Sequence, residues 1–454
     1  MLLKSLNKRF LKRSHCAFLR RSVYGLVAAV FLTTGCTMVG PDFVKPQAPV
    51  AKQWMESGDP KIKIGVSEYR QWWTVFNDPV LINLVETAYR QNLSLQISGL
   101  RILQARAQLG VVVGNLYPQL QQGAGAAAYS SISDNAPNSL GADDSYWQYN
   151  AGFDAAWELD IWGKYRRAVQ SGVANLETSI ASYDDILVTL TAEVARTYIV
   201  MRTFEERLEI ARQNVNIQQR SLQIAEIRFK AGAVTELDVT QAKSLLRNTE
   251  ASIPRFEAGI RQAKNALAVL LGKLPGEIDY MIGGQKVIPT APPEVVVDIP
   301  AELMRRRPDI QLAEYQIATQ TPLIGASKAE LYPAFQLAGS IGLATSTSKN
   351  TNAGGTGGSS FSDLFDSDSI EFFGGPSFSW NIFNYGRIKN RVRTEDALLQ
   401  QLIVNYTDTV LRAQQEVEDS LVGFLRKQQE AGSAGAGQPA LFSQRPGFLD
   451  DSPG

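Results

Sequence analysis

The sequence predicts an α+β fold in which one helix–strand–strand–helix unit occurs twice. Three observations support this prediction: a long-range duplication of aromatic and glycine motifs, segments with the strict alternation of β-strands, and one very long stretch without proline. The matching motifs are Tyr117-Pro118 with Tyr332-Pro333, Trp157 with Trp380, and Trp162-Gly163-Lys164 with Tyr385-Gly386-Arg387. We therefore expect each copy to fold as a unit that packs beside its twin.

The first 36 residues have the pattern of a bacterial export signal. They carry seven basic side chains and no acidic one. The apolar stretch at 25–32 is too short to span a bilayer as a stable helix, and it leads into Leu32-Thr33-Thr34-Gly35-Cys36, which resembles a lipoprotein processing site. We predict a signal peptide at 1–35, cleaved after Gly35, and a lipid attached to Cys36 that would hold the chain at a membrane. The alternative is an ordinary signal peptide with a chance cysteine.

The composition argues against several classes of function. The only histidine is His15, and the two cysteines are Cys16 and Cys36, so all three lie in the signal or at the lipid site. Catalysis by a His or Cys nucleophile and zinc or copper sites are therefore disfavoured. We predict no enzyme activity, no cofactor and no metal. Beyond residue 36, 38 bases face 45 acids, a net charge of about −7 that argues against nucleic-acid binding.

One enzymatic alternative remains, an envelope enzyme with paired carboxylates. Asp154, Glu158 and Asp160 occupy alternating positions, so they share one face beside Trp157 and Trp162. Acids at alternating positions more simply line a water-filled lumen.

An extended segment should precede the first helix. Residues 36–77 are rich in proline and contain Trp72-Trp73 near their end. Helical spacing begins at Asp78-Pro79, a capping acid followed by proline at the first helical position, and should continue to about Leu116.

Strand pairs follow the first helix of each copy. Apolar and polar residues alternate strictly from Tyr149 to Asp160, and copy two repeats the pattern around Trp380 with a partner strand from Phe335 to Leu343. A sheet over a soluble core and a transmembrane barrel with a polar lumen both fit this pattern. The lipid signal, the strand lengths and the aromatic residues near strand ends favour the barrel. The residues expected to face its lumen are Asn150, Asp154, Glu158, Ser377, Ser379 and Asn381. Since four strands cannot enclose a lumen, several chains must contribute.

The helices after the first strand pair are unusually long. The 64 residues from Ala168 to Ala231 contain no proline and would span roughly 96 Å as one helix. Such a helix needs other long helices to pack against. A turn at 229–235 should lead into a return helix that ends near Leu271, with a kink at Pro254. This completes repeat 1, residues 78–276.

The second repeat is predicted to be incomplete. A proline-rich linker at 277–300 precedes repeat 2 at 301–430, which has a helix to Leu331, two strands and a long helix from Arg387. Residues 431–454 are rich in Gly, Ala, Pro and Ser and are predicted to be a disordered or aberrant tail. The turn and return helix of copy two are absent from this sequence, so we expect the helix from Arg387 to expose an apolar stripe.

Five motifs in a fixed order connect this chain to a known family. They are Gly35–Phe43, Trp72-Trp73 before Phe76–Val80, Arg228–Gly232, Leu270–Gly272 with Pro275-Gly276, and Arg306–Ile310. Together with the duplication, they resemble the TolC-like outer-membrane factors of Gram-negative export systems, and specifically their NodT-like lipoprotein branch. The resemblance covers about residues 36–430.

The resemblance implies an outer-membrane channel component of a tripartite efflux system. Three chains would form a duct, each giving four strands to a 12-stranded outer-membrane β-barrel and its long helices to a periplasmic α-helical barrel. Small molecules would pass through passively, while energy comes from an inner-membrane transporter joined through a periplasmic adaptor, or membrane fusion protein. The resemblance places Arg228, Phe229, Gly232 and Asp238 at the adaptor-facing periplasmic tip.

The missing turn of copy two departs from the family, in which that turn helps to constrict the tunnel entrance. We expect a truncated duct to assemble poorly or to leak, unless a natural tail packs in another way. The alternative function is a lipid-anchored periplasmic adaptor. That function would leave the two strand pairs without a role.

Overall fold

The computed structural model describes residues 38–65, 71–131, 133, 145–283, 287–348 and 359–436. The predicted signal peptide and Cys36 lie outside these residues. The chain forms two compact units, Met1–Lys45 with Ala105–Leu176 and Tyr315–Leu402, and Pro46–Gln104 with Glu177–Glu314 and Ile403–Gly454. Each unit contains segments of both repeats, and several of the boundaries fall inside helices. The two copies are therefore interleaved in space rather than folded as separate domains.

The duplication is visible in the bounds of the secondary structure. Helix α3 spans Leu93–Gly114 and α7 spans Pro308–Ala329, so the spacing of the two Tyr-Pro motifs maps one helix onto the other end to end. Trp157 donates its indole N–H to the carbonyl of Leu116 at 3.1 Å, and Trp380 donates to the equivalent carbonyl of Leu331 at 3.0 Å. The repeat therefore preserves tertiary contacts as well as sequence motifs.

The helix predicted from Asp78 to Leu116 is in fact two helices, α2 (Pro79–Gln91) and α3. Asn92 breaks it with an extended backbone, ψ 126°. The Asn92 side chain accepts a hydrogen bond from Leu95 N at 2.9 Å and donates one to Leu270 O at 2.9 Å, so it caps the new helix and ties it to the end of α5. Copy two breaks at the equivalent residue, Arg307, with ψ 127° between α6 (Pro300–Arg306) and α7. There the following Pro308 disfavours helical backbone.

The predicted start of the first helix is confirmed. Asp78 accepts hydrogen bonds from Val80 N at 2.8 Å and Leu81 N at 3.1 Å, while its second oxygen accepts from the Tyr198 hydroxyl at 2.8 Å. An N-terminal carboxylate of this kind satisfies amides that have no partner within the helix.

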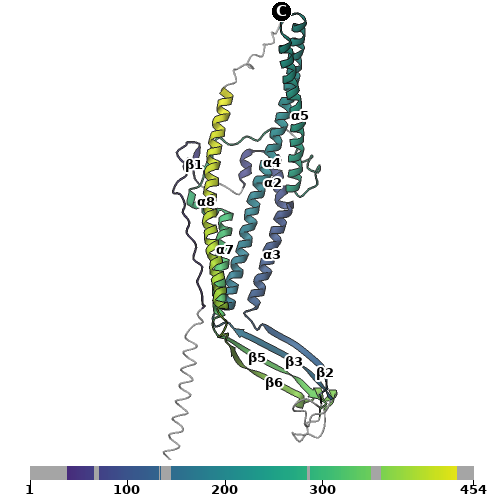
Figure 1. The fold of residues 1–454 in the computed structure, drawn as a ribbon, viewed down its shortest axis with the longest axis vertical. Helices are drawn as coiled ribbons and strands as arrows, with labels where there is room; N and C mark the ends of the chain where they lie inside the picture. Colours follow the sequence, from purple (N-terminus) through teal and green to yellow (C-terminus); the bar gives the residue numbers. More distant parts are fainter. Residues whose placement is uncertain are drawn as a thin grey trace, which may run out of the picture. The chain divides into compact units, whose positions relative to one another are not determined.

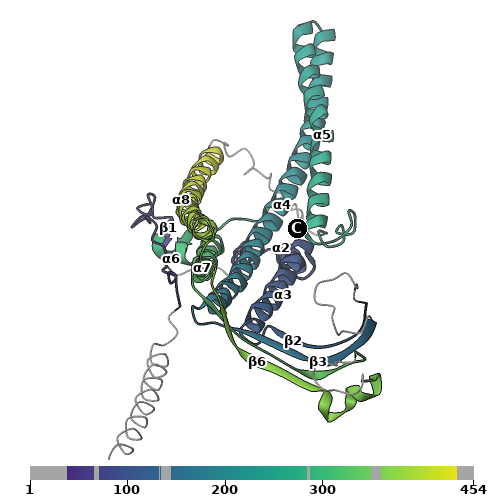
Figure 2. The ribbon, with the colours of Figure 1, turned by 60° about the horizontal axis from the view of Figure 1, so that its bottom comes forward.

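The long helical hairpin is confirmed as well. Helix α4 spans Lys164–Lys230 and α5 spans Glu236–Leu270, and the two lie side by side in both views (Figures 1 and 2). Pro254 lies inside α5, which continues past it. The second compact unit, Pro46–Gln104 with Glu177–Glu314 and Ile403–Gly454, is called the helical unit below. Its hydrophobic core packs α2 against α4 and α5. Its fully buried members include Leu81, Leu84, Val85, Val194, Met201, Leu267 and Leu271.

Two regions predicted to be irregular pair with each other. Strand β1 (Ile62–Ile64) lies in the N-terminal segment and β4 (Val295–Val297) in the proline-rich linker, and they form a two-stranded parallel sheet. A short 3-10 helix follows β1 at Trp72–Phe76. Nearby, the buried Trp54 donates its indole N–H to Asp298 O at 2.8 Å. Three-residue strands with a distant partner leave too little periodicity to be predicted.

Helix α8 (Arg387–Ala436) differs from its prediction in two ways. It continues six residues beyond Glu430, and its apolar residues are covered only in part: Tyr406, Val410, Ala413, Leu421 and Leu425 are buried, whereas Leu398, Val404, Leu411 and Val422 are exposed as predicted. The N-terminal segment runs along this part of the helix. Gln414 donates to Pro49 O at 3.0 Å and accepts from Ala51 N at 2.8 Å, and Glu418 accepts from Met55 N at 3.0 Å.

The strands of both copies join in one antiparallel sheet of order β2-β3-β5-β6 (Figure 1). Strand β2 spans Leu120–Ser131, β3 Ser145–Leu159, β5 Ala334–Ser346 and β6 Ile370–Ser379. Short 3-10 helices at Phe361–Phe365 and Ser367–Ser369 precede β6. None of the described helices is both long and apolar enough to cross a membrane.

We predict that Asn92→Ala destabilises the helical unit by about 1–3 kcal/mol, because it removes a helix cap and leaves the Leu270 carbonyl without its donor. Urea unfolding followed by circular dichroism in detergent measures this loss. Gln96→Ala, an exposed change in the first turn of the same helix, is the control and should stay within about 0.5 kcal/mol of the parent. Equal effects of the two changes would contradict the capping role.

Candidate functional site

The register of the sheet places five of the six predicted lumen residues on one face. Asp154 of β3 lies opposite Gln122 of β2 and Ser340 of β5, while Glu158 lies opposite Gln336. Because neighbouring residues across a sheet point to the same side, the pairing extends this face to β6. We call it the polar face. Its polar residues include Gln122, Gln148, Asn150, Asp154, Glu158, Gln336, Ser340, Ser346, Glu371, Ser377 and Ser379.

The sixth predicted residue, Asn381, lies in no strand. Strand β6 ends at Ser379, which pairs with Ala334, the first residue of β5. Pro333 precedes Ala334 and has no N–H with which to extend the ladder. The alternation in the sequence thus runs two residues further than the strand itself.

The opposite face of the sheet is apolar and exposed. Phe153, Ile341 and Phe372 form one row across three strands, and their side chains are 71%, 60% and 84% exposed. Further rows on this apolar face are Ala151–Leu343–Ile370, Trp157–Leu337–Pro376 and Leu159–Phe335–Phe378. A continuous apolar surface of this kind needs an apolar environment or a partner.

The charge of the sheet is one-sided. The four strands contain three charged residues, Asp154, Glu158 and Glu371, and no Lys or Arg. All three acids lie on the polar face. Glu158 forms an ion pair with Lys164 at 3.2 Å. Asp154 accepts a hydrogen bond from the side-chain amide of Gln122 at 3.4 Å.

Both edges of the sheet are open. In the described part of the chain, β2 is paired along one side with β3, and β6 along one side with β5. The strands have 12, 15, 13 and 10 residues, and about 9–11 residues suffice for a tilted strand to cross a bilayer. The sheet therefore has the strand length and the two-faced pattern of a segment of a membrane barrel.

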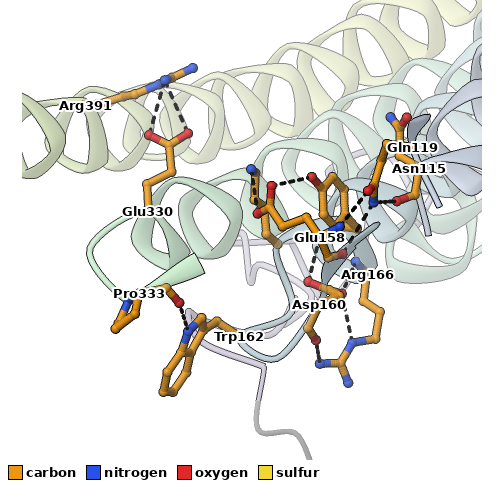
Figure 3. Close-up of polar contacts among 11 residues, drawn as sticks. Asn115, Gln119, Glu158, Asp160, Trp162, Arg166, Glu330, Pro333 and Arg391 are labelled. Carbon is orange, nitrogen blue, oxygen red and sulfur yellow. Dashed lines mark hydrogen bonds and ion pairs between the residues drawn. The ribbon is translucent and has the colours of Figure 1, made fainter. Parts of the chain in front are cut away.

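The corner where β3 meets α4 is built from charged side chains (Figure 3). Asp160 accepts hydrogen bonds from Tyr165 N at 3.0 Å and Arg166 N at 2.9 Å and also binds the Arg166 guanidinium at 3.1 Å, so it caps α4. The second Glu158 oxygen accepts from the Tyr165 hydroxyl at 2.9 Å. Burial, and then the neighbouring Glu158, raise the pKa of Tyr165. Glu158 and Asp160 thus each have a structural role at this corner.

The opposite strand–helix corner belongs to copy two and faces the first. In Figure 3 the indole of Trp162 points toward Pro333, whose carbonyl accepts its N–H at 2.8 Å, and Glu330 binds Arg391 at 3.4 Å. Trp162 also stacks on Tyr332, with ring centroids 4.7 Å apart. The two copies are therefore joined where their strands end.

The hairpin turn contains the four residues predicted at the periplasmic tip. Gly232 has a left-handed φ of 74°, which lets Ala233 N donate to Arg228 O at 2.9 Å after α4 ends. Asp238 accepts from the backbone N–H and the hydroxyl of Thr235 at 2.8 and 2.7 Å, which caps α5 and lowers the pKa of its carboxyl group. Phe229 is exposed. Gly232 and Asp238 thus build the turn, and the side chains left free for recognition include Phe229.

The Arg306–Ile310 motif forms a charge cluster in the helical unit. Arg307 makes a bidentate contact with Asp309, at 3.1 and 2.9 Å. It also donates a single hydrogen bond to Glu416 of α8 at 2.5 Å. Asp185 of α4 lies near this cluster. Burial, and then repulsion from Asp309 and Glu416, raise the pKa of Asp185, and Arg307 opposes them in part.

Sequence reasoning missed one cluster altogether, the residues that hold the start of the described chain. Arg167 is 2% exposed and binds Val39, Gly40 and Asp42. The sequence did contain a signal for this cluster. The repeat is interrupted at Arg167, because copy two has Asn390 at the equivalent position.

A two-faced antiparallel sheet with two open edges, continuous with long paired helices, defines a channel protein of the bacterial outer membrane. A family profile described as "Outer membrane efflux protein" matches residues 84–273 and 299–433. The chain belongs to the outer membrane efflux protein family, and it is the outer-membrane channel component of an efflux system. The family assignment confirms the resemblance predicted from the motifs.

Individual relatives agree with this assignment. The chain is 31% identical over 408 residues to nodulation protein T of Rhizobium leguminosarum bv. viciae, covering 89% of this chain and 79% of the relative. It is 28% identical over 400 residues to the probable outer membrane lipoprotein SilC of Salmonella typhimurium, covering 87% and 81%. Among solved structures, the outer-membrane channel OprN is similar with a TM-score of 0.78 and 29% identity, covering 87% of this chain and 84% of that one.

We predict that the helical unit loses stability as pH rises through the raised pKa of Asp185. The substitution Asp185→Asn should remove this pH-dependent loss of stability. The folded state holds the proton more tightly than the unfolded state, so the stabilisation is complete below the ordinary aspartate pKa of 3.8 and is lost above the raised value. The difference should stay below about 1 kcal/mol because Asp185 is only half-buried.

Thermal unfolding between pH 4 and pH 8 measures this difference. Asp408→Asn is the matched control, because Asp408 is the repeat equivalent of Asp185 and pairs with Arg412 at 2.7 Å on the surface. A pH slope that is the same in Asp185→Asn and in the parent would contradict the prediction.

Proposed function

We propose that three copies of this chain form one closed 12-stranded barrel and a periplasmic helical tunnel, through which small molecules pass passively. The observation that carries this proposal is the amphipathic sheet with two open edges. In a bilayer every backbone N–H and C=O group needs a protein partner, so an open edge is not tolerated. Pairing β2 of one copy with β6 of the next satisfies both edges at once, and repetition around a ring closes the barrel.

The two faces of the sheet then take opposite environments. The apolar face, with Phe153, Ile341 and Phe372, contacts lipid, and the polar face lines the lumen. Aromatic residues lie at one end of the sheet, where Trp147 stacks on Tyr149 at 5.9 Å and Tyr129 lies 5.3 Å from Trp147. Such residues suit the boundary between lipid and water.

The lumen carries a negative potential in this arrangement. Asp154 and Glu371 lie on the polar face of each copy, and no ion pair is recorded for either within the described residues. Three copies place six such carboxylates around one water-filled lumen, where low-dielectric walls strengthen their field. The duct therefore favours cations over anions of equal size.

The partners follow from the same arrangement. We infer that the turn with Arg228, Phe229, Gly232 and Asp238 meets a periplasmic adaptor, which joins the duct to an inner-membrane transporter. Phe229 supports this role, because an exposed aromatic side chain beside a rigid turn is a typical interface anchor. We also infer that Cys36 carries lipid, which anchors the chain to the outer membrane from the periplasmic side.

We predict that Ile341→Arg blocks barrel insertion while Ser340→Arg does not. The two residues are neighbours in β5 but point to opposite faces, and an arginine facing lipid near mid-membrane costs about 2–4 kcal/mol. The fraction of chain in heat-modifiable trimers, extracted from washed membranes, measures insertion. Equal losses in both variants would contradict the assignment of the faces.

Conductance across planar bilayers tests the duct itself. The purified trimer should conduct and should prefer cations, and Asp154→Asn with Glu371→Gln should lower the cation preference at unchanged trimer content. Ser377→Ala, a neutral change on the polar face, is the control. Absence of conductance from a correctly inserted trimer would overturn the proposed function.

A further inference from the structure

The first described residues are folded tightly against the corner between β3 and α4. Val39 N donates to Trp162 O at 3.1 Å. Gly163, with a φ of 82°, lies so close to Met38 that a Cβ atom there would stand 2.6 Å from the Met38 side chain. Gly40, with a φ of 96°, approaches Gly325 of α7, where a Cβ atom would stand 2.3 Å from the Gly325 Cα. Only glycine allows both contacts, because each needs positive φ and the absence of a side chain.

Arg167 is the centre of this contact. Its guanidinium donates to Val39 O at 3.2 Å, to Gly40 O at 3.1 Å and to Asp42 Oδ1 at 2.7 Å, and it also donates to Gln170 at 2.9 Å. The Arg167 side chain is buried, whereas the Asp42 side chain is 82% exposed. Burial of a cation is costly unless its hydrogen bonds are satisfied, and here the segment 38–42 supplies three of the four acceptors. We call these contacts the arginine clamp.

The second copy of the repeat shows that the fold of the corner does not need the arginine. Arg167 N donates to Gly163 O at 2.8 Å, and the equivalent Asn390 N donates to Gly386 O at 2.9 Å. Gly163 and Gly386 have nearly the same φ, 82° and 80°. The turn and the first turn of the helix are therefore alike in the two copies, although one has arginine and the other asparagine. What distinguishes copy one is the segment 38–42.

We propose that Arg167 positions the lipidated end of the chain, by fixing it to the corner at which the sheet ends. This inference rests on the proposed lipid attachment at Cys36. One residue, Thr37, separates Cys36 from Met38, and the two Cα–Cα steps between them span at most about 7 Å. The acyl chains must then enter the membrane beside strand β3 of copy one. Without the clamp the anchor would be joined to the sheet by a flexible tether and would lose its fixed geometry.

Arginine is the residue that this role requires. Its planar fork presents five N–H donors in fixed directions, which suits two backbone carbonyls and one carboxylate at once. Lysine offers one point charge, so Arg167→Lys should keep the contact with Asp42 and lose at least one carbonyl contact. We expect its effects to lie between those of the parent and those of Arg167→Asn.

A cysteine probe at position 38 reports whether the clamp is closed. In the acylated chain, Met38→Cys introduces the one free thiol, because Cys16 is removed with the signal and Cys36 is modified. Arg167→Asn, which copies the residue of repeat two, should raise the rate of maleimide labelling in membranes by about tenfold, since it removes charge-assisted hydrogen bonds. Asp42→Asn should raise the rate in the same direction without altering any buried side chain.

Arg391→Asn is the matched control for labelling. It removes a surface ion pair with Glu330 in the same unit and touches no residue of 38–42. Unchanged labelling in both Arg167→Asn and Asp42→Asn, or an equal rise in Arg391→Asn, would overturn the clamp.

Comparison of lipidated and non-lipidated chains separates positioning from a merely structural role. The non-lipidated chain is Cys36→Ala behind a signal peptide cleaved by the general peptidase. Arg167→Asn should lower the trimer fraction several-fold in the lipidated chain and leave it unchanged in the non-lipidated chain, where there is no anchor to place. Equal losses in both chains, or no loss in the lipidated chain, would overturn the proposal.

Incorporation of an alkyne-labelled fatty acid distinguishes failure of this inference from failure of its premise. If the label is absent from the parent, or if it persists in Cys36→Ala, then the lipid assignment is wrong and this proposal falls with it. If Cys36-dependent label is present and the trimer losses are equal, then the positioning role alone is wrong.

Discussion

The unpaired edges of the four-stranded sheet are the constraint on which the rest of the structure depends. Each edge strand has one row of N–H and C=O groups without a strand partner in the described chain, and lipid offers no substitute. One chain cannot remove this cost by curling its own sheet, because four strands are too few to surround a lumen. The proposed trimer would satisfy both faces and both edges at once.

Each copy of the repeat supplies one half of the sheet, and each half is attached to its helix at an equivalent point. The hairpin β2–β3 comes from copy one and β5–β6 from copy two, and β3 pairs with β5 at the centre. Trp157 and Trp380 hold the two strand ends to equivalent helix ends. The copies then diverge where they serve different neighbours. Helix α2 has 13 residues and α6 has seven, and in copy two the N-terminal segment with Trp54 lies beside α6 and α8.

Local patterns in the sequence were sufficient for the long elements. The alternation from Tyr149 to Asp160 predicted β3, the proline-free stretch predicted α4, and Asp78-Pro79 predicted the start of α2. The misses depend on contacts between residues far apart in the chain. Asn92 caps a new helix and bonds to Leu270, β1 pairs with β4, and residues 49–55 bond to side chains of α8. Arg167 was missed for the same reason, because its partners precede it by more than a hundred residues. Comparison of the copies reveals the helix break, since Pro308 follows the equivalent residue.

The pairing of β3 with β5 has a consequence for how the chain folds. Phe153 must meet Ile341, and the whole α4–α5 hairpin lies between them along the sequence. Closing so long a loop before any contact forms carries a large entropic cost, and topologies dominated by distant pairings fold slowly. Each β-hairpin and the helical pair can form from local contacts, whereas the centre of the sheet must wait for them. This topology predicts a folding stage with two separate hairpins whose apolar faces are exposed, and at this stage the chain would be most in need of protection from aggregation.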